Sequence, residues 1–338
     1  MKKILTIVTL CVYSFAQANP ADSSNFYYLK GLEEKKAKRF QVASLQFDKS
    51  IAFNPNNTEA LLENAYTNLE MRKTDQAKMF FSKVYQINPS NKQAIKELMN
   101  IYYNYRQFDK AVELAKKCVD CSESQRIIGM SSYHQEDYTT AEAYLKPYLD
   151  KNVNDAEATY TLARTYIDME ETKKAIPYME RAVKLPIAKA VWMYEQAILL
   201  YEMNDYKNSV AAFSNAVEHG YTQSLDFNEN YGFACLYSGD YEKGEKLIMS
   251  VLGKKTGNKD LLRGLAEVLY QQKQFDRSLF YCQKLIELDA KDGKALYQAG
   301  LCFQKKGEKD RGQAMCDKAI EIDPSLESLK RKKDLSFM

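Results

Sequence analysis

The sequence predicts an all-α fold, an α-solenoid of about nine helix-turn-helix units. A small residue recurs along the chain at intervals of 34, 34, 30, 34, 34, 35, 34 and 34 residues, at Ala43, Ala77, Ala111, Ala141, Ala175, Ser209, Gly244, Ser278 and Gly312. A second series keeps the same register, at Gly31, Ala65, Met99, Gly129, Ala163, Ala197, Gly232, Ala266 and Gly300. Neither strand-like alternation nor a glycine-rich loop appears. Because each repeat packs on its neighbours, a chain of 338 residues can fold this way without one large core.

The last unit, residues 294–324, shows how the pattern specifies two helices. One face of its first helix carries Leu296, Ala299, Gly300 and Phe303. After a break at Lys306-Gly307-Glu308, a second helix carries Gly312, Cys316 and Ala319. Pro324 ends that helix, since proline cannot continue it. Large residues beside small ones let the two backbones approach closely.

The repeat resembles the tetratricopeptide repeat over about residues 24 to 324. Most units carry an aromatic residue or threonine three positions before the small residue and a large residue four positions after it. Prolines close four units, at Pro55, Pro89, Pro186 and Pro324. The resemblance implies a right-handed superhelix that binds a protein or peptide. The related 35-residue RNA-reading repeats would carry a basic surface, whereas the formal net charge is +3 and falls to near +1 without residues 1–18, so no nucleic acid is expected.

The N-terminus has the form of a signal peptide at residues 1–18. A basic head at Lys2-Lys3 precedes an apolar run of 13 residues, Ile4 to Ala16, and Ala16-Gln17-Ala18 resembles a cleavage site. A retained membrane anchor would need about 20 apolar residues. Lipid attachment at Cys11 is disfavoured, because the bulky Leu10 precedes it. We therefore expect an exported protein, periplasmic if the cell has two membranes, with no integral membrane segment after cleavage.

The spacing also predicts a division of the array. The predicted segments are units one to three at 24–121, an irregular fourth unit at 122–153, units five to nine at 154–324, and a capping helix with a basic tail at 325–338. The fourth unit is irregular because its spacing is short and Pro147 lies inside its second helix, at a cost of about 3 kcal/mol. Pro177 has a similar position in the fifth unit. In the capping segment, Ser325 can cap a helix in which Leu326 and Leu329 cover the ninth unit.

The sequence offers no catalytic residue, metal site or cofactor site. The only histidines, His134 and His219, lie at helix ends in different units and cannot pair as ligands. No nucleophile elbow or phosphate-cradling loop is present. Cysteines at Cys235, Cys282 and Cys316 occupy packing positions.

The pair Cys118 and Cys121 at the irregular junction is different. Its spacing suits a local disulfide, a reduced pair or, least of all, a redox centre.

One known ligand mode of tetratricopeptide domains, a clamp for a C-terminal carboxylate, is incomplete here. Lys96 and Asn100 match the first pair of that clamp, but Ile127 and Tyr160 stand where the family pattern places other residues. The sequence therefore predicts a different mode of binding.

A second stripe of the first helices lies one residue beyond the core-facing positions, on the face that lines the concave groove in tetratricopeptide arrays. Aromatic residues fill it in every unit, at Tyr28, Tyr66, Tyr103, Tyr133, Tyr160, Tyr194, Tyr201, Phe233, Tyr270 and Tyr297. Such rings can pack between adjacent first helices, or they can form a binding groove for an extended or helical segment. Arginines that could orient a polar or acidic ligand stand among them, at Arg126, Arg164 and Arg263.

The function expected from these features is a non-enzymatic scaffold that binds a protein or peptide partner outside the cytoplasm. The alternative is an assembly or chaperone-like factor for secreted or outer-membrane clients. An enzyme is the third reading, and it would require a site that the sequence does not show.

Overall fold

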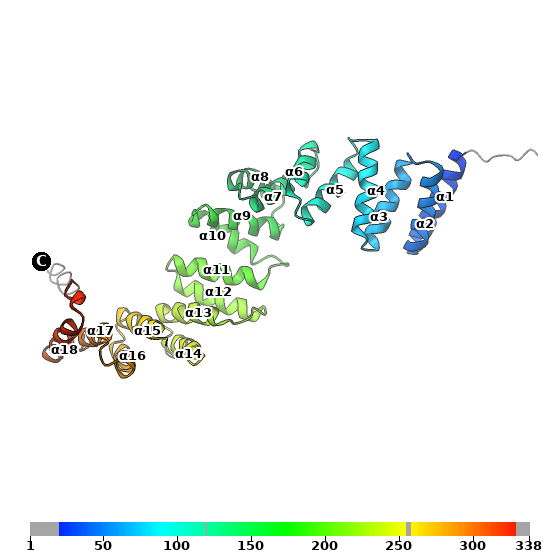
Figure 1. Ribbon diagram of the computed structural model, residues 1–338. Coiled ribbons are helices and arrows are strands. Elements are labelled where there is room, and N and C mark those ends of the chain that lie inside the picture. The colour runs from blue at the N-terminus through cyan, green and yellow to red at the C-terminus, as the bar shows by residue number, and fades with distance from the viewer. Residues whose placement is uncertain (1–19, 119, 255–257, 329–338) are drawn as a thin grey trace, which may run out of the picture. The chain divides into compact units, whose positions relative to one another are not determined.

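The computed structural model describes residues 20–328 except 119 and 255–257 (Figure 1). These residues form 18 α-helices and one short 3₁₀ helix, with no strand among them. The prediction of an all-α repeat fold is confirmed. The chain divides into two compact units, one up to Met169 and one from Glu170 onward.

The unit up to Met169 contains nine helices. They are α1 (Pro20–Lys36), α2 (Phe40–Phe53), α3 (Thr58–Glu70), α4 (Thr74–Ile87), α5 (Lys92–Asn104), α6 (Phe108–Lys117), α7 (Ser124–His134), α8 (Tyr138–Lys151) and α9 (Ala156–Asp168). The helices α1, α3, α5 and α7 each pair with the next helix to form a hairpin, each hairpin packs on the following one, and α8 packs on α9.

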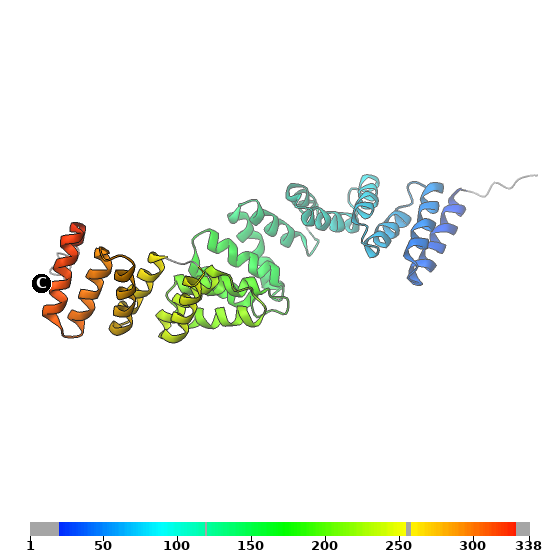
Figure 2. The same cartoon turned by 60° about the horizontal axis from the view of Figure 1, so that its bottom comes forward.

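The unit from Glu170 continues the same alternation. Its helices are α10 (Thr172–Ala182), α11 (Ala190–Glu202), α12 (Tyr206–Glu218), α13 (Leu225–Ser238), α14 (Tyr241–Leu252), α15 (Lys259–Gln271), α16 (Phe275–Leu288), α17 (Gly293–Lys305), α18 (Lys309–Ile322) and the 3₁₀ helix η1 (Pro324–Leu326). Within each unit, successive helices are joined by short turns and lie side by side (Figures 1 and 2).

The recurring small residues lie where the two helices of a hairpin cross. Ala43, Ala77 and Ala111 are fully buried. The crossing of α17 and α18 is close, since a Cβ atom added to Gly312 would lie 2.5 Å from the backbone oxygen of Gly300. Large side chains fill the remaining space, as Phe47 and Phe81 do with no exposed surface. The 34-residue spacing therefore sets the hairpin core.

The turn inside every hairpin contains one residue with left-handed backbone geometry at the same repeat position. The nine residues are Lys38, Arg72, Arg106, Glu136, Glu170, Asn204, Gly239, Lys273 and Gly307, with φ between 56° and 95°. Glycine adopts this geometry freely, yet only two of the nine are glycine. Within each compact unit, the shared turn geometry gives the two helices of a hairpin the same relation.

Polar side chains begin most of the first helices. Asn57, Asn91 and Asp155 each accept a hydrogen bond from the backbone N–H three residues later, at 2.9 to 3.0 Å. Asn258 and Asp292 do the same at 3.1 and 3.0 Å. These N-caps satisfy backbone donors that the helix itself leaves free.

The irregular spacing before the fourth unit comes from a short second helix. α6 spans 10 residues, whereas α2 and α4 span 14. A disulfide joins Cys118 to Cys121 just after α6. The hydroxyl of Ser124 donates to the carbonyl oxygen of Cys118 at 2.6 Å and ties this turn to the start of α7.

Pro147 and Pro177 lie inside helices, as the sequence predicts, but neither ends its helix. α8 continues four residues beyond Pro147, and α10 continues five beyond Pro177. Buried Tyr148 and Leu149 hold the last turn of α8 in place. Tertiary packing therefore outweighs the loss of one backbone hydrogen bond.

At the C-terminal end, Leu326 of η1 is buried against Tyr297, Cys316 and Ala319. Asp323 accepts a hydrogen bond from the backbone N–H of Ser325 at 3.1 Å and caps this turn. The rest of the predicted capping segment, from residue 329, and the predicted signal peptide at residues 1–18 lie outside the described residues. The predicted division into segments stays a prediction.

Candidate functional site

The predicted tyrosine stripe lies on the first helices of the hairpins. Nine of its ten aromatic side chains are partly exposed, and Tyr297 is buried. The sequence left two roles open for them, lateral packing and ligand binding. Their contacts show how much of each ring is already engaged.

Most of these rings contact an aromatic residue of their own hairpin. Tyrosines in the middle of a first helix contact the large residue of the second helix, as Tyr66 contacts Phe81 edge-on at 5.2 Å between ring centroids. Tyrosines at the end of a first helix contact the aromatic residue that begins the second, as Tyr270 contacts Phe275 at 5.6 Å. Each such ring keeps part of its surface exposed, which an amphipathic tyrosine tolerates.

Some of the rings also reach the next first helix. The hydroxyl of Tyr133 donates to Asp168 at 3.0 Å, and Tyr201 lies edge-on to Tyr237 at 6.1 Å. Phe233 packs beside Gly264 of α15. Lateral packing is thus part of what these residues do, and nine of the ten rings still expose part of their surface. We call these exposed ring surfaces the aromatic lining.

Burial keeps the phenol groups of this stripe protonated. It raises the pKa of Tyr66 to about 12, helped by the charges of Glu97 and Glu63. Burial also raises the pKa of Tyr133 and of Tyr201 to about 12. Since neutral phenols both donate and accept hydrogen bonds, the lining is amphipathic at any physiological pH.

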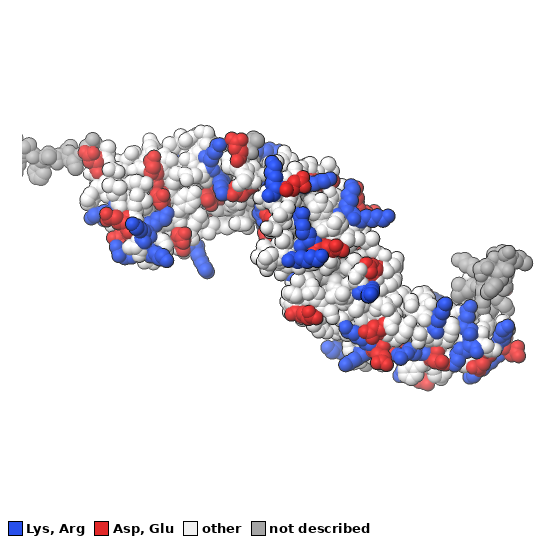
Figure 3. Space-filling model, turned by 180° about the vertical axis from the view of Figure 1, so that it is seen from behind, with Lys and Arg blue, Asp and Glu red and all other residues white. Residues whose placement is uncertain are grey.

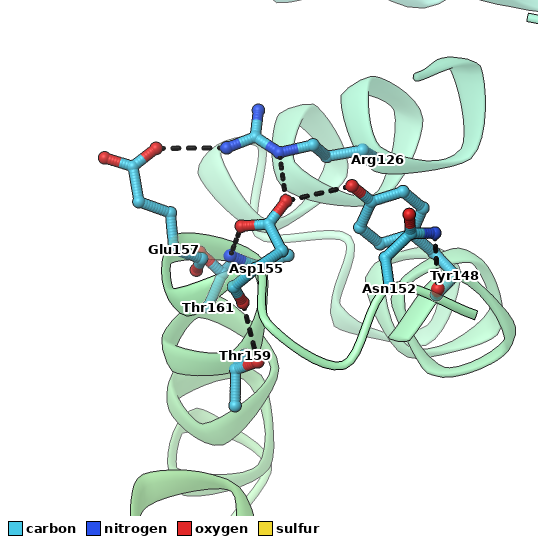
Figure 4. Close-up of polar contacts among 8 residues, drawn as sticks. Arg126, Tyr148, Asn152, Asp155, Glu157, Thr159 and Thr161 are labelled. Atoms are coloured by element: carbon cyan, nitrogen blue, oxygen red, sulfur yellow. Dashed lines mark hydrogen bonds and ion pairs between the residues drawn. The ribbon is translucent and has the colours of Figure 1, made fainter. Parts of the chain in front are cut away.

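Two of the three predicted arginines, Arg126 and Arg263, each join one first helix to the next. The Nε atom of Arg126 in α7 donates to Asp155 at 2.7 Å, and its Nη2 atom donates to Glu157 at 3.0 Å (Figure 4). The hydroxyl of Tyr148 donates to the same Asp155 carboxylate at 2.9 Å (Figure 4). Arg126 and Asp155 are 20% and 17% exposed, so this network is largely shielded from water.

Asp155 is the centre of this joint because it serves two elements. It caps α9 through the backbone N–H of Ala158 and also binds Arg126. Burial alone would raise the pKa of the Asp155 carboxyl, but the Ala158 hydrogen bond and the Arg126 charge outweigh burial and lower that pKa below 3.8.

The same joint recurs at the other end of the chain. Arg263 of α15 donates to Asp292, the N-cap of α17, at 2.8 Å and to Asp260 at 2.8 Å. Arg164 instead pairs with Asp168 of its own helix at 3.3 Å. All three arginines therefore already contact carboxylates. A partner's acidic group would have to share or displace these contacts.

A pocket of about 210 Å³ opens between α15, α16 and α17. We call it the C-terminal pocket, and its lining residues are Arg263, Ala266, Glu267, Cys282, Leu285, Lys294, Ala295, Tyr297, Gln298 and Leu326. Two of its N–H donors, the Nε atom of Arg263 and the Nε2 atom of Gln298, are buried without a hydrogen-bond partner. Unsatisfied buried donors of this kind each cost about 1 to 3 kcal/mol.

The remaining candidate residues have structural contacts. His134 stacks on Phe108 at 4.9 Å, and His219 is the C-cap of α12. The prediction that Cys235, Cys282 and Cys316 are packing residues is confirmed, because all three side chains are buried, as is that of Cys302. Burial raises the pKa of the Cys235 and Cys282 thiols to about 12, which suppresses the reactive thiolate.

Comparison with known proteins identifies the repeat. Residues 156–186 and 293–326 match the family model described as tetratricopeptide repeat. These two segments are therefore identified as tetratricopeptide repeats. Tetratricopeptide repeats are protein-protein interaction scaffolds, and their fold is typically non-catalytic. No curated protein matches the chain.

Solved tetratricopeptide structures resemble this fold at low sequence identity. The C-terminal part of a TPR repeat-containing protein from Cytophaga hutchinsonii is 17% identical, with 70% of this chain and 99% of that chain covered and a TM-score of 0.52. The TPR domain of P58(IPK) is 18% identical, with 93% and 99% covered and a TM-score of 0.30. PilW, a type IV pilus biogenesis factor, is 15% identical, with 70% and 96% covered and a TM-score of 0.39. Only the first is similar enough in structure to support the fold.

Two features of the repeats were not predicted from the sequence. The joints between Arg126 or Arg263 and the next N-cap carboxylate could have been found, since each arginine precedes an aspartate by 29 residues. The orphan donors of the C-terminal pocket leave no sequence signal, because burial without a partner depends on the packing of three helices.

Proposed function

We propose that this chain is a non-enzymatic scaffold that binds a segment of a partner protein along the aromatic lining of its first helices. The C-terminal pocket carries this proposal. Its two unsatisfied donors, on Arg263 and Gln298, lie beside Tyr297 in a cavity that also offers apolar surface. A partner backbone carbonyl or carboxylate would satisfy both donors, and an apolar side chain would fill the remaining volume.

The test separates binding from stability. Replacing Gln298 with leucine removes an orphan donor, so the free protein should keep or gain stability while partner binding falls about tenfold. A photo-reactive amino acid in place of Glu267, at the exposed rim of the pocket, would report binding by cross-linking in cells of the producing organism.

The matched control carries the photo-reactive group at Lys309, which begins α18 and is exposed. A partner that reacts from Glu267 and not from Lys309, and whose yield falls with Gln298→Leu, supports the proposal. Equal yields from both positions, or a yield that Gln298→Leu leaves unchanged, would exclude this pocket as a binding site.

The same cross-linking experiment separates the scaffold from a chaperone-like factor for secreted or outer-membrane clients. A scaffold should yield one partner in constant ratio to the chain, whereas a holding factor should yield a mixed set. Mass spectrometry of the adducts distinguishes these outcomes.

We also propose that the protein acts outside the cytoplasm, and the proposal rests on the basic head, apolar run and Ala16-Gln17-Ala18 motif. No helix in the part of the chain that the structure describes is long and apolar enough to cross a bilayer. If residues 1–18 are removed on export, the protein isolated from the cell envelope begins at Asn19. An intact Met1 on the envelope form would contradict the proposal.

A further inference from the structure

The second helices of the first two hairpins expose an unusual amount of apolar surface. We call residues 38–53 and 72–87, which contain α2 and α4, the α2/α4 face. Of the fourteen exposed large apolar side chains in the described chain, five lie on this face: Val42, Leu45, Phe53, Met79 and Ile87. Leu45 and Met79 are 60% and 56% exposed, at the same repeat position. Clustered exposed apolar residues are typical of interaction sites.

The same face is strongly basic. It carries seven basic residues and two acidic ones, and four of the basic residues lie in the turns before α2 and α4, at residues 38–39 and 72–73. Among the described residues, Lys38, Lys73 and Lys83 take part in no ion pair. In Figure 3, basic side chains gather along the lower edge of the N-terminal helices beside a broad uncharged area. This charge is available to a partner.

A groove of about 530 Å³ lies between α2 and α4, and its lining includes Leu45, Met79 and Phe80. That volume falls within the range of ligand clefts. The polar side of the groove is internally satisfied, since Ser44 donates to Asn64 at 2.7 Å and Asn64 donates to Asp48 at 2.7 Å. The apolar side chains of Leu45 and Met79, in contrast, remain exposed to solvent.

We propose that the α2/α4 face binds an acidic segment of a partner protein, with one large apolar side chain inserted between Leu45 and Met79. Carboxylates of the segment contact the lysines around the groove, and hydroxyl and amide groups such as Ser44 and Asn68 line its wall. This surface is separate from the aromatic lining, which lies on the first helices, so the chain binds two partner segments. An indented groove suits an inserted protein side chain better than the surface of an anionic bilayer.

The experiment uses the full chain with a photo-reactive amino acid in place of Gln76, an exposed residue of the groove rim. Cross-linked peptides from a native extract are sequenced by mass spectrometry. The expected peptide has a net negative charge and contains a large apolar residue at the adduct. Its yield should fall about tenfold with Leu45→Glu and Met79→Glu together, because both changes place carboxylates against an acidic ligand. It should also fall in about 1 M salt, where charges beyond about 3 Å are screened.

The matched control is Phe280→Glu. Phe280 occupies the same repeat position in α16 and is 56% exposed, but it lies outside the basic face. The Phe280→Glu variant should leave the cross-linking yield unchanged. Gln298→Leu in the C-terminal pocket should also leave it unchanged, and this result separates the present proposal from the proposed function. All variants change exposed residues or an orphan donor, so melting temperature and helical circular dichroism verify that they fold.

Several results would overturn the proposal. A cross-linked peptide that is neutral or basic would contradict it. So would the absence of any adduct, or a yield that Leu45→Glu and Met79→Glu together leave unchanged. A peptide from a second copy of this chain, with a dimer in light scattering that the double variant dissociates, would assign the face to self-association. Binding of the purified chain to phosphatidylglycerol vesicles, lost in the double variant, would assign it to a membrane surface.

Discussion

Seven of the nine hairpin turns place a residue with a Cβ atom in left-handed backbone geometry, which costs about 1 to 2 kcal/mol for a residue other than glycine. Lys273 is one of them, with φ at 60°. Lys273→Gly should therefore stabilise the protein by up to about 1 kcal/mol, after the greater freedom of glycine in the unfolded chain is subtracted.

Chemical denaturation of the wild type and the variant measures this difference. The control is Lys284→Gly inside α16, which should destabilise by about 1 kcal/mol, because glycine is a poor helix former. A loss of stability in Lys273→Gly would show that the lysine side chain contributes more than the backbone geometry costs.

The tyrosine ring environments lead to a spectroscopic prediction. Tyr66, Tyr133 and Tyr201 have pKa values raised to about 12 by burial, so they should ionise well after a free tyrosine with its pKa near 10. Ultraviolet absorbance of tyrosinate, followed with pH while circular dichroism confirms the fold, should show a late component. Tyr201→Phe should remove part of that late component and none of the early one.

For single residues, the sequence predicted which positions are buried better than it predicted which residues contact each other. The small crossing residues and the buried cysteines could be predicted, because repeat spacing places them in the hairpin core. The left-handed turn residues could not, since lysine, arginine and glutamate have no preference for that geometry and the turn imposes it on them. The aspartate partners of Arg126 and Arg263 could have been predicted, because each lies 29 residues after its arginine.

In the hairpin of α17 and α18, two glycines, Gly300 and Gly312, face each other across the helix crossing. Gly312→Ala should destabilise it by about 1 to 3 kcal/mol, although alanine occupies the same repeat position in five other units, because its Cβ atom would meet the Gly300 backbone oxygen at 2.5 Å. Thermal denaturation measures the effect. Gly253→Ala is the control, since a Cβ atom there would lie 3.5 Å from the nearest backbone oxygen. Equal melting temperatures for the two variants would contradict the close packing.

The joint between α7 and α9 should make stability depend on pH. The folded pKa of Asp155 lies below 3.8, so the unfolded chain binds this proton more readily than the folded one. Its contribution is therefore complete above about pH 5 and is lost as pH falls through the folded pKa. Asp155→Asn keeps a residue that can cap α9 but removes the charge, and it should cost about 1 to 2 kcal/mol at neutral pH.

Denaturation curves between about pH 3 and pH 7 test this prediction. The wild type should lose stability over the acid range faster than Asp155→Asn. Parallel pH profiles would show that Asp155 is not responsible.

Across the whole molecule, stability should be distributed along the array. Each hairpin buries its apolar surface on the next, and each compact unit has its own core clusters. Deleting the seventh to ninth hairpins, from residue 224 onward, should leave a shorter and less soluble protein that keeps its helical circular dichroism in proportion to length. A soluble truncated protein without helical signal would show instead that folding requires the complete chain.

The fold of the whole chain was predictable because periodicity is a property of many residues at once, and errors at single positions do not disturb it. For the candidate site, the sequence predicted only which positions of the first helices carry aromatic residues. The sequence spacing does not determine the distances between side chains. It therefore cannot show which hydrogen-bond donors lack a partner or which rings are partly covered. The α2/α4 face likewise needed solvent exposure to be found, since Leu45 and Met79 look like core residues in the sequence alone.

The joints between repeats mean that the units are not interchangeable modules. An arginine in the fourth or eighth unit requires an aspartate at the start of the next, as Arg126 requires Asp155. The seventh unit has Glu229 at the arginine's position, and Asn258, which has no charge, begins its successor. A unit moved or duplicated by recombination would therefore meet a compatible neighbour at some junctions and a charge conflict at others. The order of the repeats is therefore constrained by the charges of the residues that meet at each junction.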